Sequence, residues 1–168
     1  ANITTAANHT FEAMSLGSGN WIVTKYQKAD GTAIVAPASP VYGRVVRTAG
    51  AVTTTSTTLV DLTGATITFT TTARPVHVAF AADVYNDTVG ATTNVNVDID
   101  GALELGTAGR LYRTTTASYP FPAGIALDSA VLTAASHTIK IQWKVASGTG
   151  TIDGSAANNY VFSAHEIA

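Results

Sequence analysis

The chain of 168 residues has no cysteine and few charges. Without cysteine there is no disulfide framework, no thiolate nucleophile and no zinc site built on thiolates. Charged residues make up only 12% of the chain and the net charge is -2, so no basic field exists to hold a nucleic-acid backbone. No apolar run approaches the roughly 18 residues that a membrane-spanning helix needs. We therefore expect neither a nucleic-acid partner nor a membrane partner.

The abundant residues favour strands. The chain has 28 threonines and 29 alanines but only 4 lysines and 3 glutamates, which are common in exposed helices. From Val41 onward apolar and polar residues alternate, most clearly over 76–85, 94–100 and 137–145. Such alternation is typical of strands with one buried face, and turn residues separate about eight of these runs. We predict an all-β fold, an antiparallel jelly-roll sandwich with a short N-terminal arm and β-hairpin.

The N-terminal segment is small and polar. Residues 1–20 are interpreted as an extended arm or as one short helix over 11–16. The Asp30-Gly31 dipeptide lies between two apolar runs and predicts a hairpin over 21–35, because both residues tolerate a positive φ.

A proline-containing spacer with Pro37 and Pro40 follows this hairpin and marks a boundary. The chain is therefore predicted to consist of a docking element over 1–40 and a jelly-roll domain over 41–168. The hairpin is expected to bind a partner by strand addition, with a simple β-extension of the same domain as the alternative. The expected docking residues are Trp21, Val23 and Tyr26.

The strand expected over 76–85 is apolar on both faces for much of its length. In a small domain such a strand needs a second layer, which another subunit can supply. We therefore predict self-association, with a monomer covered by threonine as the alternative. The residues expected at the subunit interface are Phe80, Tyr85, Tyr160 and Phe162.

No catalytic or metal-binding motif emerges. The four histidines are His9, His77, His137 and His165. They are scattered along the chain, and we interpret His77 and His165 as interface or surface residues even if the fold brings them together. Asp98 and Asp100 share a strand face and suggest calcium as an alternative, but they lack the spacing of a calcium loop. We predict no enzyme, no cofactor and no metal site.

The order of segments in the second half carries a family resemblance. The stretch Ser136 to Trp143 (SHTIKIQW) precedes a final strand that ends in Glu166. Residues 44–168 thus resemble trimeric jelly-roll modules, similar to the tumour-necrosis-factor and complement globular-head fold, that recur in bacteriophage structural proteins. The resemblance implies a homotrimer with a role in adhesion or assembly.

The chain also lacks the coiled coil or collagen-like repeat of a long fibre shaft. This favours a complete small protein that decorates or cements a phage capsid, docked on the major capsid protein or another virion protein. Its expected location is the capsid surface of the virion, after production in the host cytoplasm.

An aromatic and basic segment offers an alternative function. The residues expected to make surface-loop contacts are Arg110, Tyr112, Arg113 and Tyr119. Exposed loops rich in tyrosine and arginine are typical contact surfaces, so a receptor-binding fibre tip that recognises a host surface glycan is the second hypothesis. Simple anchoring of the loop onto the barrel is the structural alternative.

Overall fold

The computed structural model describes residues 10–27 and 41–167, and the chain divides into two compact units, 1–39 and 40–168. Every regular element in the described residues is a β-strand, as predicted. Accordingly, this part of the chain contains no helix long and apolar enough to cross a membrane.

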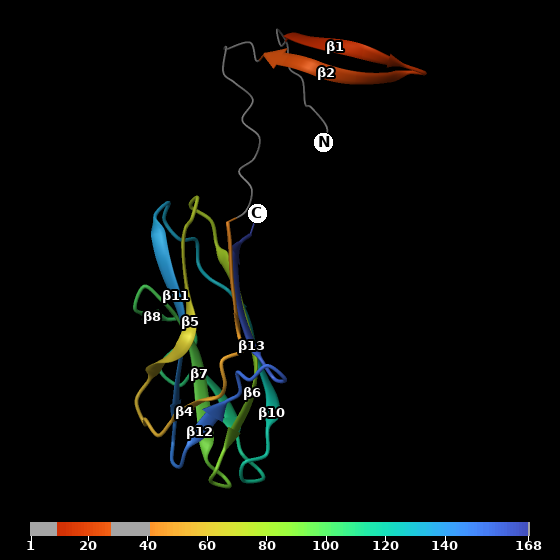
Figure 1. Ribbon diagram of the computed structural model, residues 1–168. Coiled ribbons are helices and arrows are strands. Elements are labelled where there is room, and N and C mark those ends of the chain that lie inside the picture. The colour runs from red at the N-terminus through yellow and green to blue at the C-terminus, as the bar shows by residue number, and fades with distance from the viewer. Residues whose placement is uncertain (1–9, 28–40, 168) are drawn as a thin grey trace. The chain divides into compact units, whose positions relative to one another are not determined.

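In the first unit the described residues form an antiparallel hairpin of β1 (Thr10–Gly17) and β2 (Asn20–Gln27), drawn in red and orange in Figure 1. Its turn has positive φ at Gly17 (84°), Ser18 (50°) and Gly19 (79°), which the two glycines adopt without strain. The interpretation of 11–16 as a short helix is wrong, because these residues pair with β2. The hairpin turn predicted at Asp30-Gly31 lies outside the described residues.

The second unit contains eleven strands. They are β3 (Tyr42–Arg47), β4 (Val52–Thr54), β5 (Val60–Thr70), β6 (Val76–Asn86), β7 (Thr92–Ile99), β8 (Ala102–Leu103), β9 (Arg110–Arg113), β10 (Phe121–Asp128), β11 (Ser136–Val145), β12 (Gly150–Ile152) and β13 (Tyr160–Glu166).

The main strands of this unit pair as a nested set of antiparallel hairpins. β3 pairs with β13, β5 with β11, β6 with β10 and β7 with β9. Successive pairs alternate between two sheets, since β13 also pairs with β6 and β11 also pairs with β7. The resulting strand orders, β3-β13-β6-β10 and β5-β11-β7-β9, are the two Greek keys of a jelly roll. The predicted jelly-roll sandwich is confirmed.

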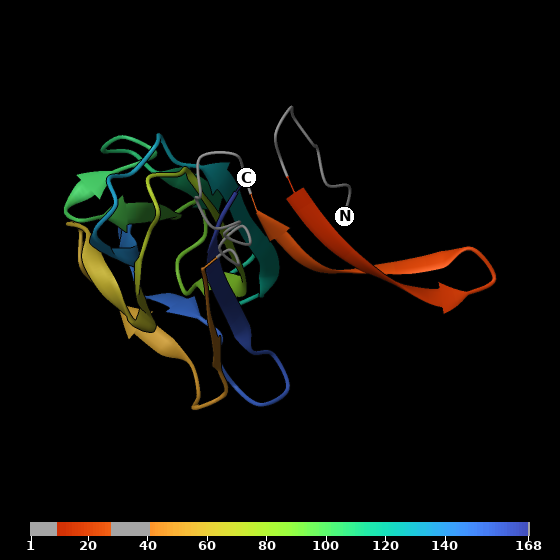
Figure 2. The same cartoon turned by 90° about the horizontal axis from the view of Figure 1, so that it is seen from above.

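We call the sheet that contains β6 sheet I and the sheet that contains β11 sheet II. In Figure 1 β5, β8 and β11 of sheet II lie on the left and β6, β10 and β13 of sheet I on the right, and Figure 2 shows the same strands from above. Short strands extend both sheets: β12 pairs with β6 and with β4 in sheet I, and β8 pairs with β7 in sheet II.

The core between the sheets comes from the alternating apolar residues. The largest fully buried side chains are Trp143, Tyr160, Phe162, Leu62, Ile139, Ile141 and Ile152. Close contact between the sheets depends on Gly43 of β3, because a Cβ atom there would clash with the side chain of Ile67 on β5. Alternation along the strands thus places the apolar side chains where the two layers meet.

The polar residues of β7 are not a solvated face. The alternation over 94–100 predicts that Asn94, Asn96 and Asp98 point to solvent, but they are only 8%, 0% and 5% exposed. The loop between β8 and β9 covers them: Asn94 donates to Ala108 O, Asn96 donates to Gly106 O, and Asn96 Oδ1 accepts from the backbone of the same loop. Asp98 accepts from Gly101 N at 3.0 Å. These side chains therefore attach a loop to the sheet.

A buried histidine joins β11 to the turn that follows β7. His137 Nδ1 lies 2.6 Å from Asp100 Oδ2, and its Nε2 lies 2.9 Å from Thr133 O. Both ring nitrogens face acceptors, so the ring is best satisfied when both carry a proton. Hydrogen bonds to Thr133 O and Asp100 raise the pKa of His137 above its usual 6.5, and those from Thr138 N and His137 lower the pKa of Asp100 below 3.8.

We expect this pair to stabilise the fold most between about pH 4 and about pH 6.5. The contribution of His137 is complete below its unfolded pKa of 6.5 and is lost as the pH rises through the higher folded pKa. The contribution of Asp100 is present above 3.8 and is lost as the pH falls through the lower folded pKa. Urea unfolding of the wild type and His137→Gln at about pH 5.5 and about pH 9 measures this. If His137→Gln lowered the free energy of unfolding equally at both pH values, this pH dependence would be contradicted.

Candidate functional site

The outer face of sheet II is polar. Its outward residues are Thr138, Lys140, Gln142 and Lys144 on β11 and Asp61, Thr66, Thr68 and Thr70 on β5. Asp61 accepts hydrogen bonds from Gln142 Nε2 at 2.8 Å and Lys140 Nζ at 3.0 Å, which hold the pKa of Asp61 below its usual 3.8. This face is suited to contact with water.

The outer face of sheet I has a different composition. We define the small-residue face as the central outward residues of three neighbouring strands: Ala79 and Ala81 on β6, Gly124 and Ala126 on β10, and Val161 and Ser163 on β13. In the register, Ser163, Ala79 and Ala126 form one row across the sheet, and Val161, Ala81 and Gly124 form the next. None of these side chains is charged. A continuous uncharged patch of this kind is typical of an interaction surface.

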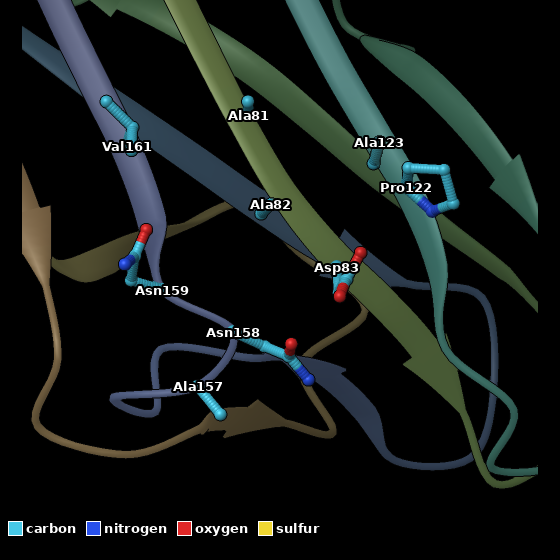
Figure 3. A pocket seen from close by; sticks show the side chains of 9 residues that line it. All are labelled: Ala81, Ala82, Asp83, Pro122, Ala123, Ala157, Asn158, Asn159 and Val161. Atoms are coloured by element: carbon cyan, nitrogen blue, oxygen red, sulfur yellow. The ribbon is translucent and has the colours of Figure 1, made fainter.

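A hollow of about 340 Å³ lies at one end of the small-residue face. Figure 3 shows Ala81 and Val161 on neighbouring strands, with Asp83 and Pro122 further along the sheet. Asn158, in the loop before β13, supplies amide groups to the rim. The hollow thus combines an apolar floor with hydrogen-bonding groups at its edge.

Charges of opposite sign lie on opposite sides of this face. Arg44 is on β3, next to Ser163 of β13, whereas Asp83 and Asp128 are on β6 and β10. Within the described residues, neither the guanidinium of Arg44 nor the carboxylate of Asp83 takes part in an ion pair. A head-to-tail contact between copies would bring such opposite edges together.

The predicted subunit-interface residues are divided between core and surface. Phe80, Tyr160 and Phe162 are 2%, 0% and 0% exposed because they point between the two sheets. They have no surface left for a partner, so the interface prediction is wrong for these three. Tyr85 lies on the outer face of sheet I, opposite Thr151, so its role at a subunit interface stays a prediction.

The N-terminal hairpin presents apolar side chains that sequence analysis did not select. Met14, Leu16 and Ile22 are 53%, 61% and 47% exposed, and Met14 pairs directly with Ile22 across the hairpin. The two-residue spacing of Met14 and Leu16 was the available signal, but the helical interpretation of 11–16 obscured it. The predicted docking residues Trp21, Val23 and Tyr26 lie on β2, and their side chains are outside the described residues.

The predicted contact segment is partly a strand. Arg110, Tyr112 and Arg113 belong to β9, and both arginines are exposed. Tyr112 is half-buried: its hydroxyl donates to Gly124 O at 2.7 Å, and burial raises its pKa. Tyr112 therefore links the edges of the two sheets. Tyr119, in the loop before β10, is 66% exposed.

The described residues contain two histidine–carboxylate pairs. The first is the His137–Asp100 pair, and the second is His77 on β6 with Asp128 on β10, at 2.6 Å between Nδ1 and Oδ1. In the described part of the chain, no serine or threonine hydroxyl is hydrogen-bonded to either imidazole, and no group of three or more His, Asp or Glu side chains is placed to hold a metal ion. Glu166 is buried and accepts hydrogen bonds from the amide and the hydroxyl of Thr72.

No protein-family model and no curated protein matches the chain. Among solved structures it is similar to derived T=1 particles of infectious bursal virus, with a TM-score of 0.43 at 11% identity over 92% of this chain and 40% of that chain. It is also similar to the structure of the Gx strain of infectious bursal disease virus, with a TM-score of 0.43 at 10% identity over 92% of this chain and 40% of that chain. For the VP2 subviral particle of that virus the TM-score is 0.39 at 10% identity, over 92% of this chain and 41% of that chain. The chain thus spans about two fifths of the length of these proteins.

Proposed function

We propose that this chain is a non-enzymatic structural protein of a virion, a homotrimer that decorates and reinforces a phage capsid. The observation that carries this proposal is the contrast between the two outer faces of the jelly roll. The face of sheet II is lined with polar and charged groups, whereas the centre of sheet I is small and uncharged. The jelly-roll topology and the resemblance to trimeric phage modules support the same function.

Self-association through the small-residue face is physically favourable. Alanine and glycine lose no side-chain rotamer entropy on burial, and their short side chains let a second surface approach the sheet closely. Head-to-tail packing places Arg44 of one subunit near the Asp83 and Asp128 edge of the next, and three such contacts close a ring. Each subunit then contributes its Arg44 edge to one contact of the ring and its Asp83 and Asp128 edge to the other.

Docking on the capsid is assigned to the N-terminal hairpin. An isolated two-stranded hairpin is only marginally stable in water, and this one exposes Met14, Leu16 and Ile22. Burial of these side chains against the major capsid protein or another virion protein would stabilise both the hairpin and the complex. The capsid surface of the virion is the corresponding location.

We expect Leu16→Asp to abolish co-sedimentation with the capsids of the phage that encodes the chain, because a carboxylate would be buried in an apolar contact. The matched control is Ser15→Asp, which places the same charge on the neighbouring exposed residue and should leave binding within about twofold. Light scattering should give the mass of three chains for both variants.

Two results would overturn the docking assignment. One is unchanged sedimentation of Leu16→Asp, and the other is unchanged sedimentation of a chain that lacks residues 1–39. A wild-type mass of one chain would overturn the trimer itself.

A glycan-binding tip of a tail or head fibre is the second candidate function. The observation that favours it is the 66% exposure of Tyr119 in a loop, since an exposed aromatic ring is suited to stacking on a sugar. Binding to a glycan array that is lost in Tyr119→Ala, with no binding to capsids, would support this function over decoration.

A further inference from the structure

Two histidines from distant parts of the sequence meet on the outer face of sheet I. His77 of β6 and His165 of β13 are direct cross-strand partners in the antiparallel ladder. Their ring centroids are 5.2 Å apart and the rings are inclined by 48°. Directly opposed side chains of an antiparallel pair point to the same side of the sheet. The two imidazoles therefore lie side by side on the surface.

A carboxylate orients one of these rings. Asp128 of β10 is the partner of His77 on its other side, and its Oδ1 lies 2.6 Å from His77 Nδ1. When Nδ1–H donates to this carboxylate, the lone pair of the neutral ring is on Nε2. A carboxylate that holds a histidine in this tautomer is the usual outer partner of a metal-ligating histidine.

We propose that His77 and His165 chelate one divalent transition-metal ion, such as Zn²⁺, Ni²⁺ or Cu²⁺, with Asp128 as the positioning residue and water in the remaining coordination positions. Neutral imidazole prefers these ions, whereas Ca²⁺ and Mg²⁺ prefer oxygen ligands. With two protein ligands the site is weaker than a structural zinc site with four.

The site is open to solvent in one subunit. The side chain of His77 is 33% exposed and that of Asp128 is 59% exposed. Tyr42, the cross-strand partner of His165 on β3, is 58% exposed and lies at the other end of the same row. An ion can therefore reach the pair without any rearrangement of the sheet. This inference is independent of the proposed virion role.

Calorimetric titration of the full chain with ZnCl₂, and with MgCl₂ as the comparison ion, tests the chelate. We expect one Zn²⁺ per chain and no response to Mg²⁺. Either His77→Asn or His165→Asn should remove the binding, and Asp128→Asn should weaken it by about tenfold. The matched control is His9→Asn, which removes a histidine of the other unit and should bind as the wild type does.

The titration is repeated on Ala81→Glu, so that subunits packed on this face cannot conceal the histidines. Zinc binding by either the wild type or Ala81→Glu that depends on both His77 and His165 supports the chelate. Absence of binding in both proteins, or binding that survives the loss of either histidine, overturns it. Far-UV circular dichroism of each variant confirms that the fold is intact.

Discussion

Replacing Ala81 with glutamate should lower the solution mass from that of three chains to that of one. Ala81 is exposed and lies at the centre of the small-residue face, between Val161 and Gly124 in its row. In a trimer packed through this face, each contact would have to bury the added carboxylate without a partner. Burial of an unpaired charge costs about 4 kcal/mol, which weakens association roughly a thousandfold.

Light scattering coupled to size exclusion measures this change directly. Thr68→Glu is the matched control, because Thr68 is exposed at a similar place on the outer face of sheet II, and its mass should stay at three chains. If Ala81→Glu remains a trimer while its fold is unchanged, the small-residue face is not the subunit contact. The wild type should also melt at a temperature that rises with protein concentration, whereas Ala81→Glu should not show this dependence.

Trp143→Ala should destabilise the jelly roll by about 3–5 kcal/mol. Trp143 is 1% exposed near the C-terminal end of β11 (Ser136–Val145), where it pairs with Val60 of β5 and Val95 of β7. Truncation removes the largest buried side chain and leaves a cavity that the rigid sheets fill only partly. The melting temperature should fall by roughly 10 °C or more.

The second tryptophan provides the control for this experiment. Trp21 lies on β2 in the first unit, so Trp21→Phe should leave the unfolding transition of the jelly roll unchanged. Far-UV circular dichroism follows the unfolding of both variants, because Trp143→Ala removes the tryptophan of the second unit and leaves no tryptophan fluorescence signal there. If Trp143→Ala cost less than about 1 kcal/mol, close packing around this residue would be contradicted.

Local alternation was enough to predict the longer strands of the second unit. Residues 76–86, 92–99 and 136–145 form strands because their apolar side chains recur at every second position. The same reasoning did not decide residues 11–16, where an extended arm and a short helix both stayed open. Pairing with β2 decides that segment, since cross-strand hydrogen bonds outweigh a weak local preference.

The sequence by itself determined the all-β class, the sandwich and the alternation that separates core from surface. It did not determine which of two apolar faces is inside, so Phe80, Tyr160 and Phe162 were placed at an interface although they fill the core. The tertiary structure also decided which polar residues meet. A loop covers Asn96, and His165 lies beside His77 although 88 positions separate them in the chain. Periodicity describes one strand at a time. Such contacts depend on the register between strands and on the path of the loops, and both are fixed only when the whole sandwich has folded.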